Sequence, residues 1–190
     1  MPKTTHKSLL AALMFASAAH SADDALAERL SAVAAQRSDR IAFTEKQYSP
    51  IFVEPAVNWG YLALDPKSGA LIKNVDAPEA ITMVVDDQDM LITQDGETRR
   101  ISLRKRPEMQ ALFQSIQSLL RGDIAGLERY FTLEFVASED QWTLTMKPLH
   151  ERLERRVEVL EVRGEKARIL SIRTQRAIDD YDVMTLHPAG

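Results

Sequence analysis

The chain has 190 residues, which is enough for one domain with a sizeable core and too few for two comfortable ones. It contains no cysteine, which excludes a disulfide framework, a thiolate metal site and a cysteine nucleophile. The formal net charge of -4 argues against nucleic acid as the main partner.

The first residues have the layout of a secretory signal peptide. Lys3 and Lys7 give a positive n-region, and LLAALMFASAA at 9–19 is an apolar h-region. Small residues suited to cleavage follow, with 19–21 (AHS) as the favoured site and 16–18 (ASA) as the second choice. The alternative interpretation is an N-terminal membrane anchor, but the apolar run is short for a span.

We therefore expect a signal peptide at 1–21 and a single mature domain at 22–190. No cysteine follows the h-region to carry a lipid anchor, so we expect a soluble monomer in the periplasm. No later apolar stretch of the sequence is long enough to cross a membrane.

The mature chain opens with a predicted helix at 23–36 (DDALAERLSAVAAQ). Asp23 or Asp24 can cap its N-terminus, and apolar residues recur at helical spacing. The period then changes to two, which is typical of strands. Six short strands are predicted, separated by turn residues: 41–48, 60–64, 70–75, 80–85, 90–94 and 99–105.

A helix is predicted to interrupt the strands after residue 106. Pro107 suits its first turn, and one broad apolar stripe runs through Phe113, Ile116 and Leu120. Asp123 can cap a shorter second helix. Five further strands are predicted at 131–138, 141–148, 154–162, 166–174 and 182–188.

This order of elements predicts an α+β domain dominated by antiparallel sheet. A large sheet that curls, with an amphipathic helix over its mouth, encloses a concave apolar interior. The alternative is that the helix fills this interior as ordinary core, and periodicity by itself favours that alternative.

Several short motifs occur in a characteristic order along the mature chain. They are Phe43-x-Glu45, Gly60-Tyr61-Leu62 with Pro66, Pro78 with Asp87 and Leu91, Leu119-Leu120-x-Gly122-Asp123, and Trp142-x-Leu144-x-Met146-x-Pro148. Each is weak alone, but the ordered set resembles the family of the periplasmic lipoprotein carrier LolA, which includes the outer-membrane receptor LolB. The resemblance covers nearly the whole mature chain.

Three positions depart from the pattern of the family. Asp65 stands where the carrier has an arginine associated with ligand handling, Leu71 where it has a tryptophan, and Gln88 where it has a hairpin glycine. The sequence therefore resembles a divergent branch, and its cargo can be a lipoprotein, a glycolipid or an acylated pigment.

The resemblance implies a strongly bent antiparallel sheet forming an unclosed barrel around an apolar cavity, with an N-terminal helix and a mid-chain helical lid. Ile51, Phe52 and Val53 would then lie at or near the cavity mouth. Together with strand alternation and the helical stripe, the resemblance, which also places Trp59 near the mouth, gives the expected wall and lid: Phe43, Trp59, Leu62, Leu64, Leu71, Met83, Val85, Met90, Ile92, Phe113, Ile116, Leu120, Phe135, Trp142, Leu144 and Met146.

The sequence offers little catalytic equipment. His150 and His187 are far apart and in no metal-ligand spacing, and the acidic turn at 86–89 lacks the glycine and distal glutamate of an EF-hand loop. We expect no metal and no cofactor. The remaining catalytic possibility is a carboxylate pair such as Glu45 with Asp182.

A basic run is the most suggestive surface feature: Arg99, Arg100, Arg104, Lys105 and Arg106, with Arg152, Arg155 and Arg156 as an extension if the strands are neighbours. One interpretation is a solvated edge strand guarded by charge. The other is a docking patch for an acidic membrane partner or anionic headgroups.

Three functional hypotheses follow. The first is a carrier of acylated cargo, with an inner-membrane export complex as donor and an outer-membrane acceptor. The second is an interaction module of an envelope, glycolipid or pigment export system, and the third is a lipid-modifying enzyme. We favour the non-enzymatic carrier.

Overall fold

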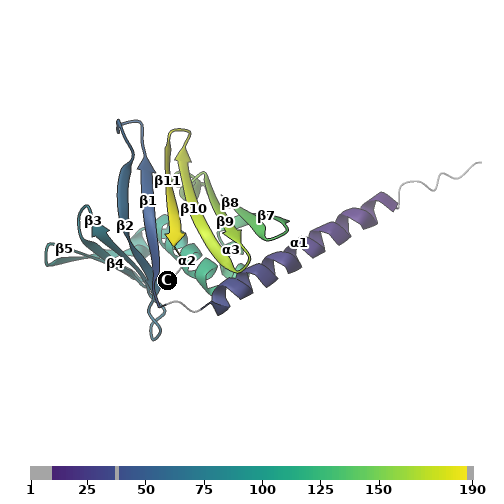
Figure 1. Cartoon of the computed structure of the whole chain (residues 1–190), viewed down its shortest axis with the longest axis horizontal. Helices are drawn as coiled ribbons and strands as arrows, with labels where there is room; N and C mark the ends of the chain where they lie inside the picture. The colour runs from purple at the N-terminus through teal and green to yellow at the C-terminus, as the bar shows by residue number, and fades with distance from the viewer. Residues whose placement is uncertain (1–9, 37–38, 188–190) are drawn as a thin grey trace, which may run out of the picture.

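The structure is a computed structural model that describes residues 10–36 and 39–187. The strands of this part form one antiparallel sheet in the order β6-β5-β4-β3-β2-β1-β11-β10-β9-β8-β7 (Figure 1). The strands are β1 (Ile41–Tyr48), β2 (Ala56–Leu64), β3 (Leu71–Ala77), β4 (Ile81–Val85), β5 (Asp89–Gln94), β6 (Glu97–Ser102), β7 (Phe131–Ser138), β8 (Gln141–Pro148), β9 (Val159–Glu165), β10 (Arg168–Ala177) and β11 (Asp180–His187).

The sheet is bent and open. Its two edges, β6 and β7, do not pair with each other, and the strands fan out around helices that lie on one face (Figure 1). The helices are α1 (Leu10–Ala35), α2 (Pro107–Arg121), α3 (Ile124–Glu128) and α4 (Glu151–Glu154), with a 3-10 turn η1 (Leu103–Lys105) before α2. The predicted α+β fold with an unclosed antiparallel barrel is confirmed.

Helix α1 differs from the sequence prediction at its start. It is continuous from Leu10, so the predicted beginning at Asp23 or Asp24 is wrong. The reason is that residues 10–22 are rich in alanine, leucine and methionine, which favour a helix. The predicted signal peptide lies partly outside the described residues and stays a prediction. Among the residues that are described, no helix is long and apolar enough to cross a membrane.

Several predicted strands had wrong boundaries: β2 begins at Ala56 and not at 60, and β10 extends to Ala177. For two further strands the structure shows the reason. The strand predicted at 99–105 ends at Ser102, because Leu103 turns inward to a buried position and its N–H donates to the carbonyl of Gln88. The strand predicted at 154–162 begins only at Val159. Leu153 and Val157, both buried and four residues apart, belong instead to the short helix α4 and the turn after it.

Strand β1 lies in the middle of the sheet, between β2 and β11. Pairing of β1 with β11 joins the two ends of the sheet-forming chain in a central seam, where the Thr44 hydroxyl and the His187 imidazole are 2.9 Å apart. Beside β1, the strand β2 approaches β3 closely at a register shift. A Cβ at Gly60 would lie 1.9 Å from the carbonyl oxygen of Asn74, so this approach requires glycine.

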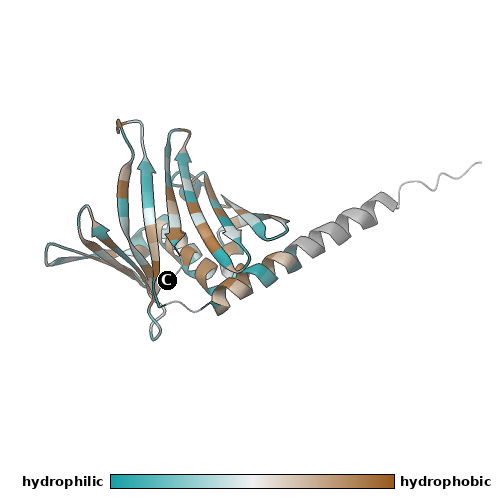
Figure 2. Cartoon of the chain, in the orientation of Figure 1, coloured by the Kyte–Doolittle hydropathy of each residue, from teal (hydrophilic) through white to brown (hydrophobic). Residues whose placement is uncertain are grey.

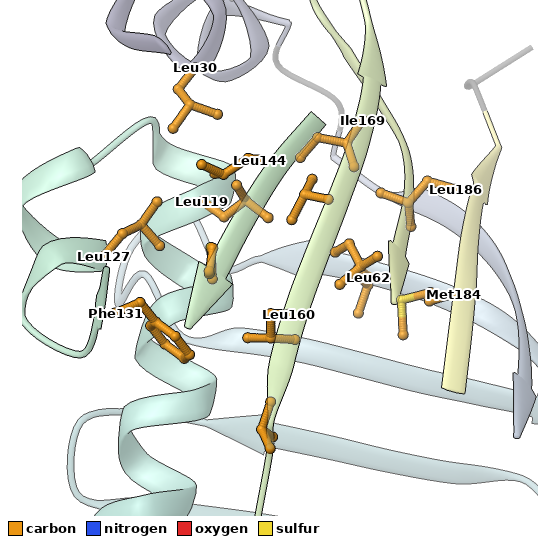
Figure 3. Close-up of a cluster of buried hydrophobic side chains, with 14 of the residues drawn as sticks. Leu30, Leu62, Leu119, Leu127, Phe131, Leu144, Leu160, Ile169, Met184 and Leu186 are labelled. Atoms are coloured by element: carbon orange, nitrogen blue, oxygen red, sulfur yellow. The ribbon is translucent and has the colours of Figure 1, made fainter. Parts of the chain in front are cut away.

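The core has two parts, both on the concave face. The larger cluster joins α1, α2 and α3 to the inner faces of β7–β11 through side chains such as Leu30, Leu127 and Leu144 (Figure 3). The smaller cluster packs Leu71, Val85, Met90 and Leu103 beneath the other side of α2. Figure 2 shows the apolar residues of the strands gathered toward the helices.

Candidate functional site: a cavity beneath helix α2

A cavity of about 400 Å³ lies between the sheet and helix α2. Its apolar lining comes from one face of the helix and from inward positions of the strands and of the turn after α4. The apolar lining residues are Met109, Leu112, Phe113, Ile116, Leu62, Leu71, Val85, Val157, Ile172 and Met184. This volume is within the range of sites that hold a small molecule.

Part of the cavity wall is charged. The Lys73 ammonium donates to both carboxylate oxygens of Glu45 at 2.7 and 2.8 Å, and the Asn58 amide donates to the same group at 3.4 Å. The Glu45 side chain is 5% exposed, so the ion pair compensates a charge that burial would otherwise penalise. Lys73 also lies 5.4 Å above the centre of the Phe43 ring.

A second ion pair lies on β10 and β11. The Arg176 guanidinium donates to Asp182 and, at 2.8 Å, to Asp180. Burial raises the pKa of the Asp182 carboxyl above its ordinary value, and the nearby charge of Glu45 raises it further, against the opposing effect of Arg176. Thr174 and Gln47 complete this polar side of the cavity.

The two carboxylates considered as a catalytic possibility do lie close together in the structure. Glu45 and Asp182 line the same cavity and influence each other electrostatically. Each is also held by a cation of its own, Lys73 or Arg176. This arrangement favours charge compensation within the wall over proton transfer to a substrate.

Helix α2 is fastened to the sheet by polar contacts at the turns. The Arg121 guanidinium donates to the carbonyl of Gly69, and the Gln117 amide donates to the carbonyl of Val85 at 3.2 Å. The Gln110 amide donates to the carbonyl of Asp87 at 2.7 Å. Because these contacts join the helix to the β2–β3 and β4–β5 turns, opening of the cavity on that side requires breaking them.

Asp65 occupies one of those turns. Its Oδ1 accepts hydrogen bonds from the backbone N–H of Ser68 at 2.6 Å and of Lys67 at 3.0 Å. The hydrogen bonds from Ser68 hold the pKa of Asp65 below its ordinary value. At the position where the family has an arginine, this chain thus has a residue that stabilises the β2–β3 turn.

Five of the predicted site residues line the cavity: Leu62, Leu71, Val85, Phe113 and Ile116. Leu64, Met83, Met90, Ile92 and Leu120 pack in or against the smaller core cluster instead. The structure places Phe43, Trp142, Leu144 and Met146 in the larger core cluster, and Phe135 packs against it. These residues do not line this cavity, and their contact with a ligand stays a prediction.

Trp59 lies away from the cavity. It pairs with Thr44 across β1 and β2, and paired residues point to the same face of a sheet. Phe43 and Glu45, the neighbours of Thr44, point inward. Trp59 therefore lies on the outer face, where its side chain is half exposed.

The predicted docking patch is not a single surface. Arg99 pairs with Ile92 and Arg100 with Leu91, so these two arginines point to opposite faces of the edge strand β6. Arg104 and Lys105 are exposed on the 3-10 turn η1, and Arg106 lines the cavity.

The proposed extension of the basic run is also divided. Arg156 lines the cavity together with Arg106. The Arg156 guanidinium lies 3.9 Å from the Glu108 carboxylate. Arg152 borders a different groove, outside α2. Among the side chains that the structure describes, those of residues 23–36 and 39–187, there is no group of three or more that could bind a metal.

The sequence prediction missed apolar lining residues, namely Met109, Leu112, Val157, Ile172 and Met184, and it also missed polar and charged ones. Lys73, Thr174 and Arg176 occupy inward positions of strands whose other inward residues are apolar. A charge that interrupts the apolar face of a strand is the available signal, because such a residue is costly in a dry core.

An open, bent antiparallel sheet with a helix across its concave face defines a half-barrel protein with an apolar interior site. The sequence matches the family model of outer membrane lipoprotein carrier protein LolA-like proteins over residues 16–189, and the chain belongs to that family. No curated protein matches the chain in sequence.

Solved structures with a similar fold are distant. A LolA superfamily protein from Nitrosomonas europaea has 10% identity and a TM-score of 0.44, covering 88% of this chain and 91% of its own. The lipoprotein LppX from Mycobacterium tuberculosis has 10% identity and a TM-score of 0.43, covering 88% and 98%. LprF from Mycobacterium bovis has 12% identity and a TM-score of 0.41, covering 90% and 95%. These likenesses carry no argument about function.

Proposed function

We propose that the protein is a periplasmic carrier that shields acyl chains of a lipoprotein or another lipid beneath helix α2 and delivers them toward the outer membrane. The observation that carries this proposal is the cavity of about 400 Å³ lined by Met109, Leu112, Phe113 and Ile116 in a chain of the LolA-like family. An inner-membrane export complex would supply the cargo, and an outer-membrane acceptor would receive it.

Burial of an acyl chain supplies the affinity. Each CH₂ group removed from water contributes about 0.8 kcal/mol, so even part of one chain binds without covalent chemistry. Met109 suits a wall that accepts flexible chains, because an unbranched thioether side chain repacks easily. The charged side of the cavity, with Lys73 and Arg176, offers hydrogen-bonding groups to the polar end of the cargo.

The test compares two enlarged side chains on the same helix. Met109 lines the cavity, whereas Ala111 is 4% exposed and lies in the larger core cluster. Met109→Trp should reduce binding of a fluorescent fatty acid to delipidated protein at least fivefold and change the melting temperature little. Ala111→Leu should leave the affinity of the folded protein unchanged while costing about 1–3 kcal/mol of stability through overpacking.

The outcomes separate the hypotheses. If delipidated wild-type protein binds no fatty acid, the carrier proposal fails and the non-enzymatic interaction module becomes the better one. If both variants lose affinity equally while folded, the ligand does not occupy the cavity beneath Met109. Turnover of a labelled lipid would instead support an enzyme.

A further inference from the structure

The most exposed large apolar side chains of the described residues lie at one end of the sheet. Val53 is 103% exposed, Ile178 86% and Ile51 83%, and Phe52 beside them is 46% exposed. Ile51, Phe52 and Val53 belong to the turn between β1 and β2, and Ile178 to the turn between β10 and β11. We refer to these four residues as the apolar rim.

The two turns are neighbours in space. Strands β1 and β11 remain paired up to Tyr48 and Tyr181, whose rings stack with centroids 4.5 Å apart. Phe52 and Val53 border a surface hollow together with Asp179, next to Ile178. Both hairpins end at the same side of the molecule, and Figure 2 shows an apolar tip on the β1–β2 hairpin (Figures 1 and 2).

The side chains of the rim and of the strand ends behind it are arranged as in a segment that inserts into a lipid interface. Aliphatic side chains form the outermost layer, and the stacked rings of Tyr48 and Tyr181 follow behind them. The Arg173 guanidinium lies 3.7 Å from the centre of the Tyr181 ring. Tyrosine rings favour the headgroup level of a bilayer, and arginine reaches the same level along its aliphatic stem.

The shape and charge of the rim favour a zwitterionic membrane over a protein or an anionic membrane as its partner. Two narrow projecting turns offer much less than the roughly 800 Å² per partner that a stable protein interface buries. Within the described part of the chain, neither Glu54 nor Asp179 in these turns forms an ion pair. Their negative charge opposes binding to an anionic surface, so a zwitterionic one fits best.

The rim lies at the end of the sheet where polar residues of β1 and β10 line the cavity. Gln47, which lines the cavity, precedes Tyr48, and Arg176, which also lines it, lies two residues before Ile178. We propose that the apolar rim inserts into the interface of a zwitterionic lipid bilayer and so holds this end of the cavity close to the membrane. This proposal concerns a surface outside the cavity, and it does not depend on which cargo the cavity binds.

The experiment measures binding of the full chain to phosphatidylcholine vesicles by flotation. In the rim variant, Ile51, Val53 and Ile178 are each replaced by serine. In the control variant, three apolar residues that are exposed elsewhere, Val136, Leu149 and Leu170, receive the same replacement. The apolar residues 9–19 are common to all these proteins, so the comparison isolates the rim.

We expect the rim variant to lose at least tenfold in vesicle partitioning, while the control variant remains within twofold of the wild type. Val53→Asp alone, at a fully exposed position, should lose at least threefold. Replacing half of the lipid by phosphatidylglycerol should weaken wild-type binding.

Equal losses in the rim and control variants, or binding by the wild type only to anionic vesicles, would overturn the proposal. A wild type that does not bind vesicles would overturn it as well. Fatty-acid binding in the absence of vesicles should be unchanged in the rim variant. Failure of the membrane proposal and failure of the carrier proposal are therefore distinguishable.

Discussion

The two sides of the interior beneath α2 differ in the kind of side chain that their strands direct inward. On the side of β7–β9, the inward residues Trp142, Leu144 and Leu160 are all buried and apolar. On the side of β1, β3, β10 and β11, apolar inward residues alternate along the strands with Glu45, Lys73, Arg176 and Asp182. The first side is packed, and the second side, where charged side chains form ion pairs, encloses the cavity.

The packed side has no room for an added side-chain atom at Gly164. The Trp142 indole N–H donates to the carbonyl of Lys166 at 3.0 Å, and the ring lies across Gly164. A Cβ at Gly164 would lie 2.0 Å from a ring carbon, so no larger residue fits there without movement. On the open side, Thr174 and Gln47 face the cavity.

The largest expected effect comes from one substitution made on both sides. Leu144 is fully buried in the packed side, and Leu144→Ala should cost about 2–5 kcal/mol of unfolding free energy by leaving a cavity. Leu112 already faces a cavity, so Leu112→Ala should cost less than half of that. Urea unfolding of the two variants measures both values, and equal losses would contradict the division into a packed and an open side.

A smaller effect is expected when the charged wall of the open side is broken. Lys73→Met leaves the Glu45 carboxylate without its cation, and a buried group that loses its partner costs about 1–3 kcal/mol. The double variant Glu45→Gln with Lys73→Met should recover most of the loss. Thermal unfolding of the three proteins tests this, and a single variant as stable as wild type would mean that water alone compensates Glu45.

The smallest expected effect is a pH dependence from Asp182. Its folded pKa lies above the ordinary 3.8, so the folded protein binds this proton before the unfolded chain does. The resulting stability is complete below 3.8 and is lost as pH rises through the folded pKa.

Asp182→Asn removes that titration. The difference in unfolding free energy, wild type minus variant, should therefore be largest in acid and decrease toward neutral pH. Unfolding of both proteins across this range supplies the measurement. A difference that increases with pH would show that the ion pair with Arg176 outweighs the burial of the carboxyl.

The sequence predicted the sheet well because strand alternation is a local signal. The ordered motifs also predicted the bent, open arrangement through the resemblance to the family. The sequence did not predict how the interior is divided, since Trp142 and Leu62 show the same alternation and both are buried, although only Leu62 lines the cavity. That difference depends on whether helices from elsewhere in the chain, such as the segment around Leu30, fill the space above the strand.

The ion pair between Glu45 and Lys73 was missed for a related reason, although Glu45 was considered together with Asp182. Glu45 and Lys73 are 28 positions apart in the chain and meet only through the pairing of β1, β2 and β3. Each residue alone resembles an ordinary solvent-facing charge. Only the register shows that both point inward, and register depends on the partner strands.

The central seam also has a consequence for how the chain folds. Apart from β1 and β11, every pair of neighbouring strands in the sheet is consecutive in the chain, so β1–β6 and β7–β11 form two meanders of local contacts. Thr44 and His187, which meet across the seam, are separated by 143 positions. Local hairpins form quickly, whereas contacts of high sequence separation are slow because a long loop must close first. The two meanders should therefore form before they join, and the strands that join last are the ones whose turns carry the apolar rim.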